Sequence, residues 1–466
     1  MIWLLSSSVL AQEPCHTLNH FDHTAFRQVF PPPPPSGEKS SIDIYELPNV
    51  VVSENFALRW GADQDLNAEQ TEPLLLAFEN AWEHEINLMN FPVPKGADSR
   101  LFNVYIGNSG SNSPSTYGAA GYYSSDDAGW PMIVLDLDVL QSHDSYGVVP
   151  HEFFHAVQHA CDTYSYDGMS AWYWESTAIW IENEVYPDEA EYSWFLFGFA
   201  FLPHKSLHFF NYPQLGEVSE YYQYGAFIFP KYLSTFLVEP MVVRDSWVDA
   251  VPGELPLEWW QRYFSDTNFH DIVYDFSMRN VYWDYPHQEW YQTYLDYYDS
   301  YFPNENMSIT KTVNSYGEVG WETVPFSLLP EHYGVNYIRL QNPQASEFEI
   351  GVVGDTVGDF GSSVSWRVGL VRKTEENLSY VDLGAGDTTI IRDVQSEEEL
   401  TLVIVPEGQS IEWGEQFSYE YLIRVYEEPV PEPEDAPKMS CSKLSSNEGI
   451  WAFWAVTIVL FRQKLS

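Results

Sequence analysis

The segment VVPHEFFHAVQHA, residues 148–160, determines how the rest of the chain is interpreted. It places His151 and His155 four residues apart, and on a helix two such side chains project from the same face. Pro150 has no backbone N–H and is tolerated only in the first turn of a helix. The segment therefore predicts a helix that begins near Gly147 and presents two imidazoles side by side.

Paired imidazoles at this spacing can bind one metal ion. Each ring can reach Zn²⁺ at about 2.0–2.1 Å, and Glu152, beside the first histidine, can take a proton from a metal-bound water. Phe153 and Phe154 separate the two histidines and are expected to face the core. The alternative is a buried amphipathic helix in which the two histidines are incidental.

A third ligand is expected on the next helix, within WYWESTA at residues 172–178. Glu175 follows the second histidine by 175 − 155 = 20 positions, which leaves room for a turn at residues 166–168 and a helix that returns antiparallel. Two histidines, one glutamate and an open water position make a catalytic zinc site, whereas four protein ligands close a structural one. Glu182 or Glu184, about two turns further along, are the alternative third ligands.

Together the two segments resemble the gluzincin metallopeptidases. Residues 151–155 match their His-Glu-x-x-His motif, and residues 172–178 match the Trp-x-x-Glu-x-x-Ala sequence around their glutamate ligand. The resemblance implies a zincin-like fold, a zinc ion held by the two histidines and Glu175, and Glu152 as general base. Ile179 stands where thermolysin-like enzymes have an aspartate. No Gly-x-Met-Glu-Asn exopeptidase signature lies upstream, so we expect an endopeptidase.

A narrower resemblance joins the same helix to the end of the chain. The run His-Glu-Phe-Phe-His-Ala-Val-Gln, residues 151–158, is similar to one in secreted bacterial metalloproteases with MYXO-CTERM-type sorting tails. In such tails a cysteine precedes an apolar run that basic residues close, which is the order of Cys441, residues 450–461 and the two basic residues after them. The resemblance covers roughly residues 50–240 and, more loosely, the tail.

The gluzincin resemblance also implies a hydrogen-bond donor for the oxyanion of the tetrahedral intermediate. Tyr224 is the first candidate, with His204 and His208 as alternatives. The same resemblance implies that the strand at residues 132–137 is the edge on which an extended polypeptide substrate pairs. His159, one turn after the second metal-binding histidine, is expected to contact a neighbouring side chain or solvent rather than the metal.

Hydrophobic periodicity predicts an α+β fold. Strands are expected at residues 56–60, 101–106 and 132–137, with a helix at residues 67–90. Short alternating runs then predict an antiparallel β-sandwich with strands near 336–341, 347–352, 363–371, 400–405 and 419–426. We expect a signal peptide (1–11), a Pro-rich leader (12–43), a zincin-like catalytic domain (44–305), a β-sandwich domain (306–428), and an acidic Pro-rich linker with a hydrophobic sorting tail (429–466).

Both ends of the chain carry features of protein targeting. Residues 1–11, MIWLLSSSVLA, are apolar and end in a small residue, as a secretory signal peptide does. No basic residue precedes them, which points to a truncated start. The apolar run at 450–461 is short for a transmembrane helix, and the basic residues after it favour a sorting tail over a terminal helix docked on the protein. In the leader, His16, His20 and His23 could bind a metal with Cys15, although a solvated segment is preferred.

The composition excludes nucleic acid as a partner. Asp and Glu number 68 against 21 Lys and Arg, and the net charge of −47 repels phosphate backbones and anionic membranes. Membrane contact is therefore expected only through the tail. The aromatic content of 17% predicts a core rich in packed aromatic rings first, and a substrate groove lined with rings second. Of the three cysteines, Cys441 lies in the tail, so Cys15 and Cys161 are the only pair expected in the mature folded protein. They can form at most one disulfide. The alternative is that all three thiols are unpaired.

The sequence thus predicts a secreted or envelope-bound zinc endopeptidase that acts on polypeptides. The alternatives are a surface adhesion protein with an idle zincin domain and a zinc hydrolase of non-peptide substrates. An intact Glu152 disfavours the idle domain, which needs no base. Ca²⁺ is a second expected ion, through the carboxylates of Asp126, Asp127, Asp136 and Asp138, although no ligand loop of recognisable spacing is present.

Overall fold

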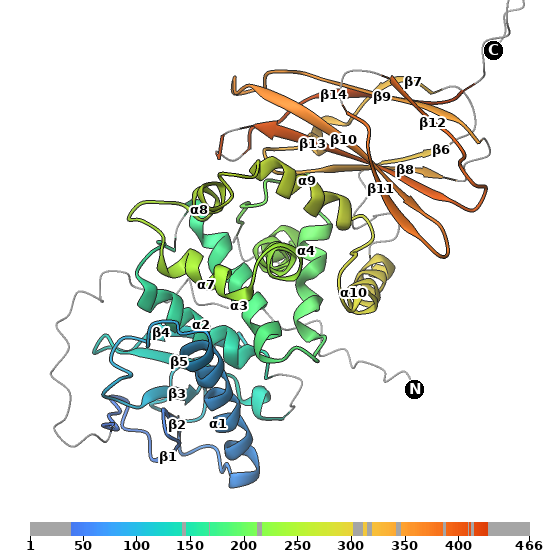
Figure 1. Cartoon of the computed structure of the whole chain (residues 1–466). Coiled ribbons are helices and arrows are strands. Elements are labelled where there is room, and N and C mark those ends of the chain that lie inside the picture. Colours follow the sequence, from blue (N-terminus) through green and yellow to red (C-terminus); the bar gives the residue numbers. More distant parts are fainter. Residues whose placement is uncertain are drawn as a thin grey trace, which may run out of the picture. The chain divides into compact units, whose positions relative to one another are not determined.

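The computed structural model describes residues 39–141, 146–166, 168–211, 217–301, 311–314, 319–341, 346–384, 388–408, 410–411 and 414–426. The predicted signal peptide, nearly all of the leader, and the predicted linker and tail lie outside these residues. The described residues up to Tyr426 belong to one unit of helices and sheets (Figure 1), which confirms the predicted α+β class. Within the described part of the chain, no helix combines the length and the apolar character that a membrane span requires.

Five strands form the sheet that supports the motif helix: β1 (Asn49–Val52), β2 (Phe56–Trp60), β3 (Phe102–Ile106), β4 (Gly121–Ser125) and β5 (Pro131–Leu135). Their order is β1-β2-β3-β5-β4, with β2, β3 and β5 parallel and the two outer strands antiparallel. Every residue of β3 and β5 is buried, as expected of strands covered on both faces. The three strands predicted in this region are confirmed within about two residues.

One prediction about this sheet is wrong. The strand predicted at residues 132–137 is not an edge, because β5 lies between β3 and β4, and β4 is the outer strand. The loop between β4 and β5 explains the order. The side chain of Asp126 accepts hydrogen bonds from the backbone amides of Ala128 and Trp130, both at 2.9 Å, and closes a tight turn. The chain therefore returns antiparallel beside β4 and leaves β4 outermost.

Two helices and a π-helical turn pack beside this sheet. The predicted helix at 67–90 is α1 (Ala68–Trp82) followed by the π-helix η4 (Glu83–Leu88). Asn67 and Gln70 form a capping box at its start, which satisfies backbone amides that the first turn leaves unpaired. The motif helix is α2 (Val148–Cys161), with Gly147 at its N-cap as predicted.

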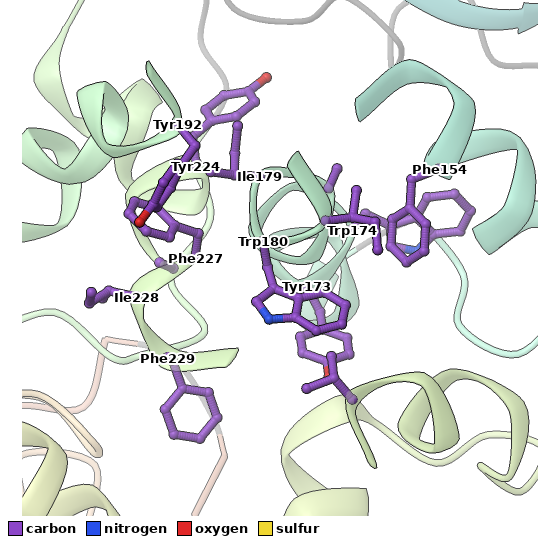
Figure 2. Packing of buried hydrophobic residues seen from close by; sticks show 14 of the residues in the cluster. Phe154, Tyr173, Trp174, Ile179, Trp180, Tyr192, Tyr224, Phe227, Ile228 and Phe229 are labelled. Atoms are coloured by element: carbon purple, nitrogen blue, oxygen red, sulfur yellow. The ribbon is translucent and has the colours of Figure 1, made fainter. Parts of the chain in front are cut away.

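Helix α3 (Ala171–Val185) is the antiparallel return that the sequence predicted, and it lies at the centre of the helical core. All residues from Ala171 to Asn183 are buried. Figure 2 shows aromatic side chains that project from α3, among them Trp174 and Trp180, and the ring of Tyr224 from α5 (Tyr222–Gly225). Trp174 packs edge-on against Trp247 with 5.4 Å between ring centroids. Removing such a ring would cost roughly 3–5 kcal/mol, so α3 is held firmly in position.

The remaining helices complete this core: α4 (Leu196–Ala200), α5 (Tyr222–Gly225), α6 (Ile228–Tyr232), α7 (Pro240–Val248), α8 (Pro256–Tyr263), α9 (Phe269–Arg279) and α10 (Gln288–Tyr301). Shorter 3₁₀ or π turns are η5 (Leu137–Gln141), η7 (Gly168–Ser170), η8 (Glu191–Phe195), η9 (Val218–Tyr221), η10 (Leu233–Leu237) and η11 (Phe326–Leu328).

The C-terminal region is a sandwich of two sheets. Its strands are β6 (Lys311–Asn314), β7 (Val319–Thr323), β8 (Asn336–Gln341), β9 (Phe348–Gly354), β10 (Val364–Lys373), β11 (Leu378–Asp382), β12 (Thr388–Ile391), β13 (Glu399–Gly408) and β14 (Tyr419–Val425). The sheet orders are β11-β10-β13-β8-β6 and β12-β9-β14-β7. All pairs are antiparallel except β6 with β8, which is parallel. The five predicted strands are confirmed. The prediction missed β6, β7, β11 and β12, which are short.

Strand β13 is buried on both faces. Leu400, Leu402 and Ile404 pack between the two sheets of the sandwich. Val403 and Val405 belong to the core that contains the helices, and α9 contacts this face. Two hydrophobic cores thus share one strand. The predicted domain boundaries stay predictions.

Candidate metal centre

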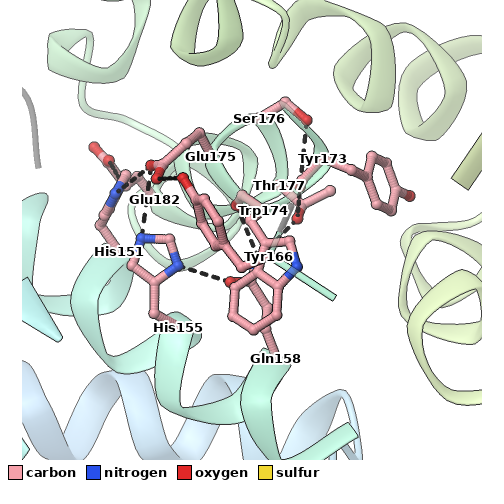
Figure 3. Close-up of polar contacts among 10 residues, drawn as sticks. All are labelled: His151, His155, Gln158, Tyr166, Tyr173, Trp174, Glu175, Ser176, Thr177 and Glu182. Atoms are coloured by element: carbon pink, nitrogen blue, oxygen red, sulfur yellow. Dashed lines mark hydrogen bonds and ion pairs between the residues drawn. The ribbon is translucent and has the colours of Figure 1, made fainter. Parts of the chain in front are cut away.

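Three predicted ligands come together between α2 and α3. The candidate ligand atoms of His151, His155 and Glu175 all lie within 4.8 Å of one another, and all three residues are buried. Glu175 Oε2 lies 3.5 Å from His151 Nε2 and 3.6 Å from His155 Nε2 (Figure 3). These distances are too long for good hydrogen bonds. They are close to the spacing of about 3.3 Å between ligand atoms of a tetrahedral zinc with bonds of about 2.0–2.1 Å.

The burial of these atoms is further evidence that the three residues fit a metal ion. Within the described residues, His155 Nε2 and Glu175 Oε2 are buried and have no hydrogen-bond partner. Such an atom costs about 1–3 kcal/mol when it is left unsatisfied, more when charged. A cation at the point where the three side chains converge would satisfy both atoms. The side chains present therefore fit a divalent metal that accepts nitrogen and oxygen ligands.

The orientation of the His155 ring is fixed by a contact at Nδ1, the ring nitrogen that does not face Glu175. Its Nδ1 lies 2.7 Å from Gln158 Oε1. The amide of Gln158 in turn donates to the backbone carbonyl of Trp174 at 2.8 Å and to Thr177 Oγ1 at 3.0 Å, both on α3. Because the Gln158 oxygen can only accept, Nδ1 of His155 carries the proton and Nε2 presents its lone pair toward Glu175.

His151 is held in the same way by a carboxylate. Its Nδ1 lies 2.9 Å from Oε1 of Glu182, which follows Glu175 by 182 − 175 = 7 residues on α3. Glu182 was named from the sequence as an alternative third ligand. In the structure it instead contacts Nδ1 of His151, the ring nitrogen that faces away from Glu175. Glu184, the other alternative, interacts electrostatically with Lys231. A carboxylate behind a metal-binding histidine fixes its tautomer and makes it a stronger ligand.

The charge of Glu175 is secured by its neighbours. Burial tends to raise the pKa of this carboxyl, but the nearby imidazoles of His155 and His151 outweigh burial and lower it to about 2. Tyr166 donates a hydrogen bond of 2.7 Å to Oε1 and leaves Oε2 directed at the histidines. By contrast, burial raises the pKa of Glu182 despite its contact with His151. Glu175 is therefore the carboxyl that is anionic where a cation would bind.

Glu152 follows His151 on α2 and lies next to the edge strand β4. It is fully buried on α2. Gly121, the first residue of β4, sits so close that a Cβ on it would lie 3.2 Å from Glu152 Cγ and 2.8 Å from Leu135 Cδ2. Only glycine permits this approach of the β4 backbone. The predicted general base is thus positioned beside both a metal ligand and the outer strand of the sheet.

Tyr224, the predicted hydrogen-bond donor to the oxyanion, lies beside the candidate metal ligand His151. It is buried on α5, and its ring is nearly parallel to the ring of His151 with 6.3 Å between centroids. Phe195 packs on the same ring at 5.2 Å. The structure therefore brings Tyr224 to the candidate ligands, while its part in catalysis stays a prediction.

The two alternatives to Tyr224 lie against the C-terminal region. The backbone carbonyl of His204 accepts a hydrogen bond from the amide of Glu331, and the Nε2 atom of His208 donates one to the carbonyl of Ile411. Burial lowers the pKa of both imidazoles to about 4. Their recorded contacts assign them to the packing of the helices on the sandwich.

Other predicted features are placed away from the metal ligands. His159 Nδ1 lies 2.7 Å from the Tyr123 hydroxyl on β4, as expected of a residue that contacts a neighbouring side chain. Cys161 forms no disulfide within the described residues, and Cys15 lies outside them. The side chain of Asp136 accepts a hydrogen bond of 3.0 Å from the backbone amide of Asp138. The side chain of Asp126 accepts similar bonds from backbone amides in its own turn.

The expected Ca²⁺ site is not assembled from the four predicted aspartates. The described residues contain one group of three or more metal-binding side chains, and it is the one formed by His151, His155 and Glu175.

Sequence reasoning missed three residues that position the ligands. Gln158 follows His155 by three positions and shares its helical face, so periodicity could have identified it. Glu182 was considered only as a direct ligand, although its place beyond Glu175 could have suggested the outer position. Tyr166 had no local signal, because its contact with Glu175 depends on how the turn before α3 folds.

Comparison with known proteins identifies the chain's family without assigning a function. Residues 38–418 match a family of unknown function, DUF6055, and the chain therefore belongs to it. The match spans the N-terminal sheet, the helices that hold the candidate metal centre, and nearly all of the sandwich. No curated protein matches the chain.

Proposed function

We propose that this member of the DUF6055 family is a secreted, zinc-dependent endopeptidase. The observation that carries the proposal is the convergence of two imidazoles and one carboxylate at His151, His155 and Glu175, with Glu152 beside them. Three protein ligands leave one position of a tetrahedral zinc open to water, as catalytic sites require. Export is proposed from the apolar run at residues 1–11 alone.

The residues divide the chemistry between them. When bound, zinc would polarise the scissile carbonyl and lower the pKa of a bound water toward about 7. Glu152 takes the proton of that water and delivers it to the leaving amine. Tyr224 donates a hydrogen bond to the oxyanion that develops on the substrate carbonyl. Gln158 and Glu182 keep both imidazoles aimed at the same point.

A polypeptide substrate suits the strand order of the sheet. The outermost strand, β4, begins at Gly121 in direct contact with Glu152. An extended peptide that pairs with β4 would pass its backbone carbonyls over the general base. β4, rather than the strand at 132–137, is thus the proposed docking edge. This geometry favours peptide bonds within a chain over small ester or amide substrates.

The test combines metal content with a cleavage profile. Purified wild-type protein should hold one zinc per chain and cut unfolded proteins. Glu152→Gln keeps the size of the side chain, so it should retain zinc while cleavage falls by roughly 10²–10⁴-fold. Glu375→Gln, at an exposed position in the sandwich, is the control for an equal change of charge.

Each departure from this result has a distinct meaning. Equal cleavage by wild type and Glu152→Gln would reject Glu152 as the base. A zinc-loaded wild type that leaves all proteins intact but hydrolyses small esters or amides would reject the peptidase and favour a non-peptide zinc hydrolase. A chain that holds zinc and hydrolyses neither would favour the idle domain.

A further inference from the structure

A cavity of about 150 Å³ lies directly behind the first metal ligand. Its lining residues are Tyr146, Gly147, Glu182, Tyr186, Glu189, Glu191 and Tyr192. Glu182 joins the cavity to the metal centre, because its Oε1 atom contacts Nδ1 of His151 at 2.9 Å. Sites for drug-sized ligands occupy about 300–1,000 Å³, so this cavity suits a single long side chain.

The lining has one sign of charge. Glu182, Glu189 and Glu191 contribute three carboxylates, and none of the residues that line the cavity is a lysine or arginine. Glu182 is more than nine-tenths buried. Its second oxygen, Oε2, faces Gly147, where a Cβ would lie only 2.8 Å away. The glycine thus leaves open the space in front of this carboxyl oxygen, and both residues line the cavity.

The aromatic residues complete a binding site for a cation. Tyr146, Tyr186 and Tyr192 supply apolar walls for a hydrocarbon stem and electron-rich faces for a positive head. The hydroxyl of Tyr192 lies 2.9 Å from that of Tyr291, which anchors this wall. Carboxylates form stronger hydrogen bonds with guanidinium or ammonium groups than with neutral donors.

We infer that this cavity is a specificity pocket that receives a lysine or arginine side chain of the peptide substrate. The inference rests on the proposed function and adds the substrate class to it. A substrate residue held there would lie next to His151, so its backbone would be close to the bond that is cut. The protein would then cleave beside basic residues.

The test compares zinc-loaded full-length protein with two double variants. Glu189→Gln with Glu191→Gln neutralises the cavity without touching Glu182, which contacts a metal ligand. Glu375→Gln with Glu376→Gln makes the same change of net charge at exposed positions in the sandwich and is the control. The substrates are pairs of peptides that differ only in arginine against citrulline at one position beside the cleaved bond.

Wild type should cleave the arginine peptide at least about tenfold faster in kcat/KM, and the cavity variant should lose most of this ratio. The control should keep it. Cleavage by wild type with no preference for a basic residue would overturn the inference and leave the proposed function intact.

A wild type that cleaves no peptide would reject the proposed function, and binding then tests the cavity separately. N-acetylarginine amide should bind the zinc-loaded protein more tightly than N-acetylcitrulline amide, and the cavity variant should lose the difference. Equal or absent binding of the two amides would overturn the inference.

Discussion

Two buried clusters of histidine and glutamate can be compared within this chain. The candidate metal centre consists of His151, His155 and Glu175. The second cluster, which we call the junction cluster, lies where the helices meet the sandwich and consists of Lys205, Ser206, His208, Glu331, His332 and Glu415. Both clusters take charged or titratable groups out of water, which is costly unless each group is paired.

The clusters satisfy their carboxylates in different ways. Glu331 accepts hydrogen bonds from Lys205 Nζ at 2.7 Å and Ser206 Oγ at 3.1 Å. Glu175 Oε2 instead faces two imidazole nitrogens at 3.5 and 3.6 Å. A carboxylate that already has donors at hydrogen-bond distance serves packing. A carboxylate oxygen that stands slightly too far from two ring nitrogens for a hydrogen bond fits the proposed zinc ion between the three atoms.

The largest predicted difference is in metal binding. Glu175→Gln removes the anionic ligand, so zinc should be lost, and a chelator should no longer lower the melting temperature because metal binding contributes to folding free energy. Glu331→Gln should keep a full zinc complement but lower the free energy of unfolding by about 1–3 kcal/mol, since its donors lose a charged acceptor. Zinc analysis and thermal melts check both, and zinc loss from Glu331→Gln would undo the distinction.

The second prediction concerns acid and the junction cluster. Burial is the main cause that lowers the pKa of His208 to about 4, against about 6.5 in the unfolded chain. Below pH 6.5 the unfolded chain therefore takes up a proton that the folded chain refuses, and stability falls as the pH drops toward 4. From pH 7 to pH 5 this amounts to roughly 2 kcal/mol.

Urea unfolding of metal-free wild type and His208→Gln at the two pH values measures this difference. The variant should lose less stability on acidification. Parallel losses in the two proteins would show that folding does not lower the pKa of His208.

The smallest predicted effect separates two neighbouring acids on α3. Glu182→Gln weakens the partner of His151 Nδ1 and should reduce zinc affinity by roughly 10–100-fold. Glu184→Gln, directed toward Lys231, should change the affinity little. Competition with a chelator of known affinity gives both values. An equal loss of zinc affinity in the two variants would mean that the loss follows from removing any negative charge on α3, and not from the contact of Glu182 with His151.

The sequence predicted the parts of the site that depend on local geometry. His151 and His155 share one helical face by spacing alone, and the position of Glu175 needed only a turn and an antiparallel helix. The edge strand was assigned wrongly because strand order depends on how the turn closed by Asp126 folds back, which no periodicity reports. The junction cluster was equally hidden, since Lys205 and Glu331 are far apart in the chain and meet only through tertiary packing.

Strand β13 has a consequence for how this protein can change over evolutionary time. Alternate residues of this strand belong to two hydrophobic cores. If recombination replaced the sandwich with that of another protein, the new strand would need side chains at positions 403 and 405 that pack against the same helices. Shuffled modules usually join through exposed linkers with few contacts across them. Here the helical part and the sandwich meet at a buried strand, β13, and the family match from residue 38 to 418 includes both parts. The enzyme-like half and the sandwich are therefore expected to be inherited together, with substitutions in one compensated in the other.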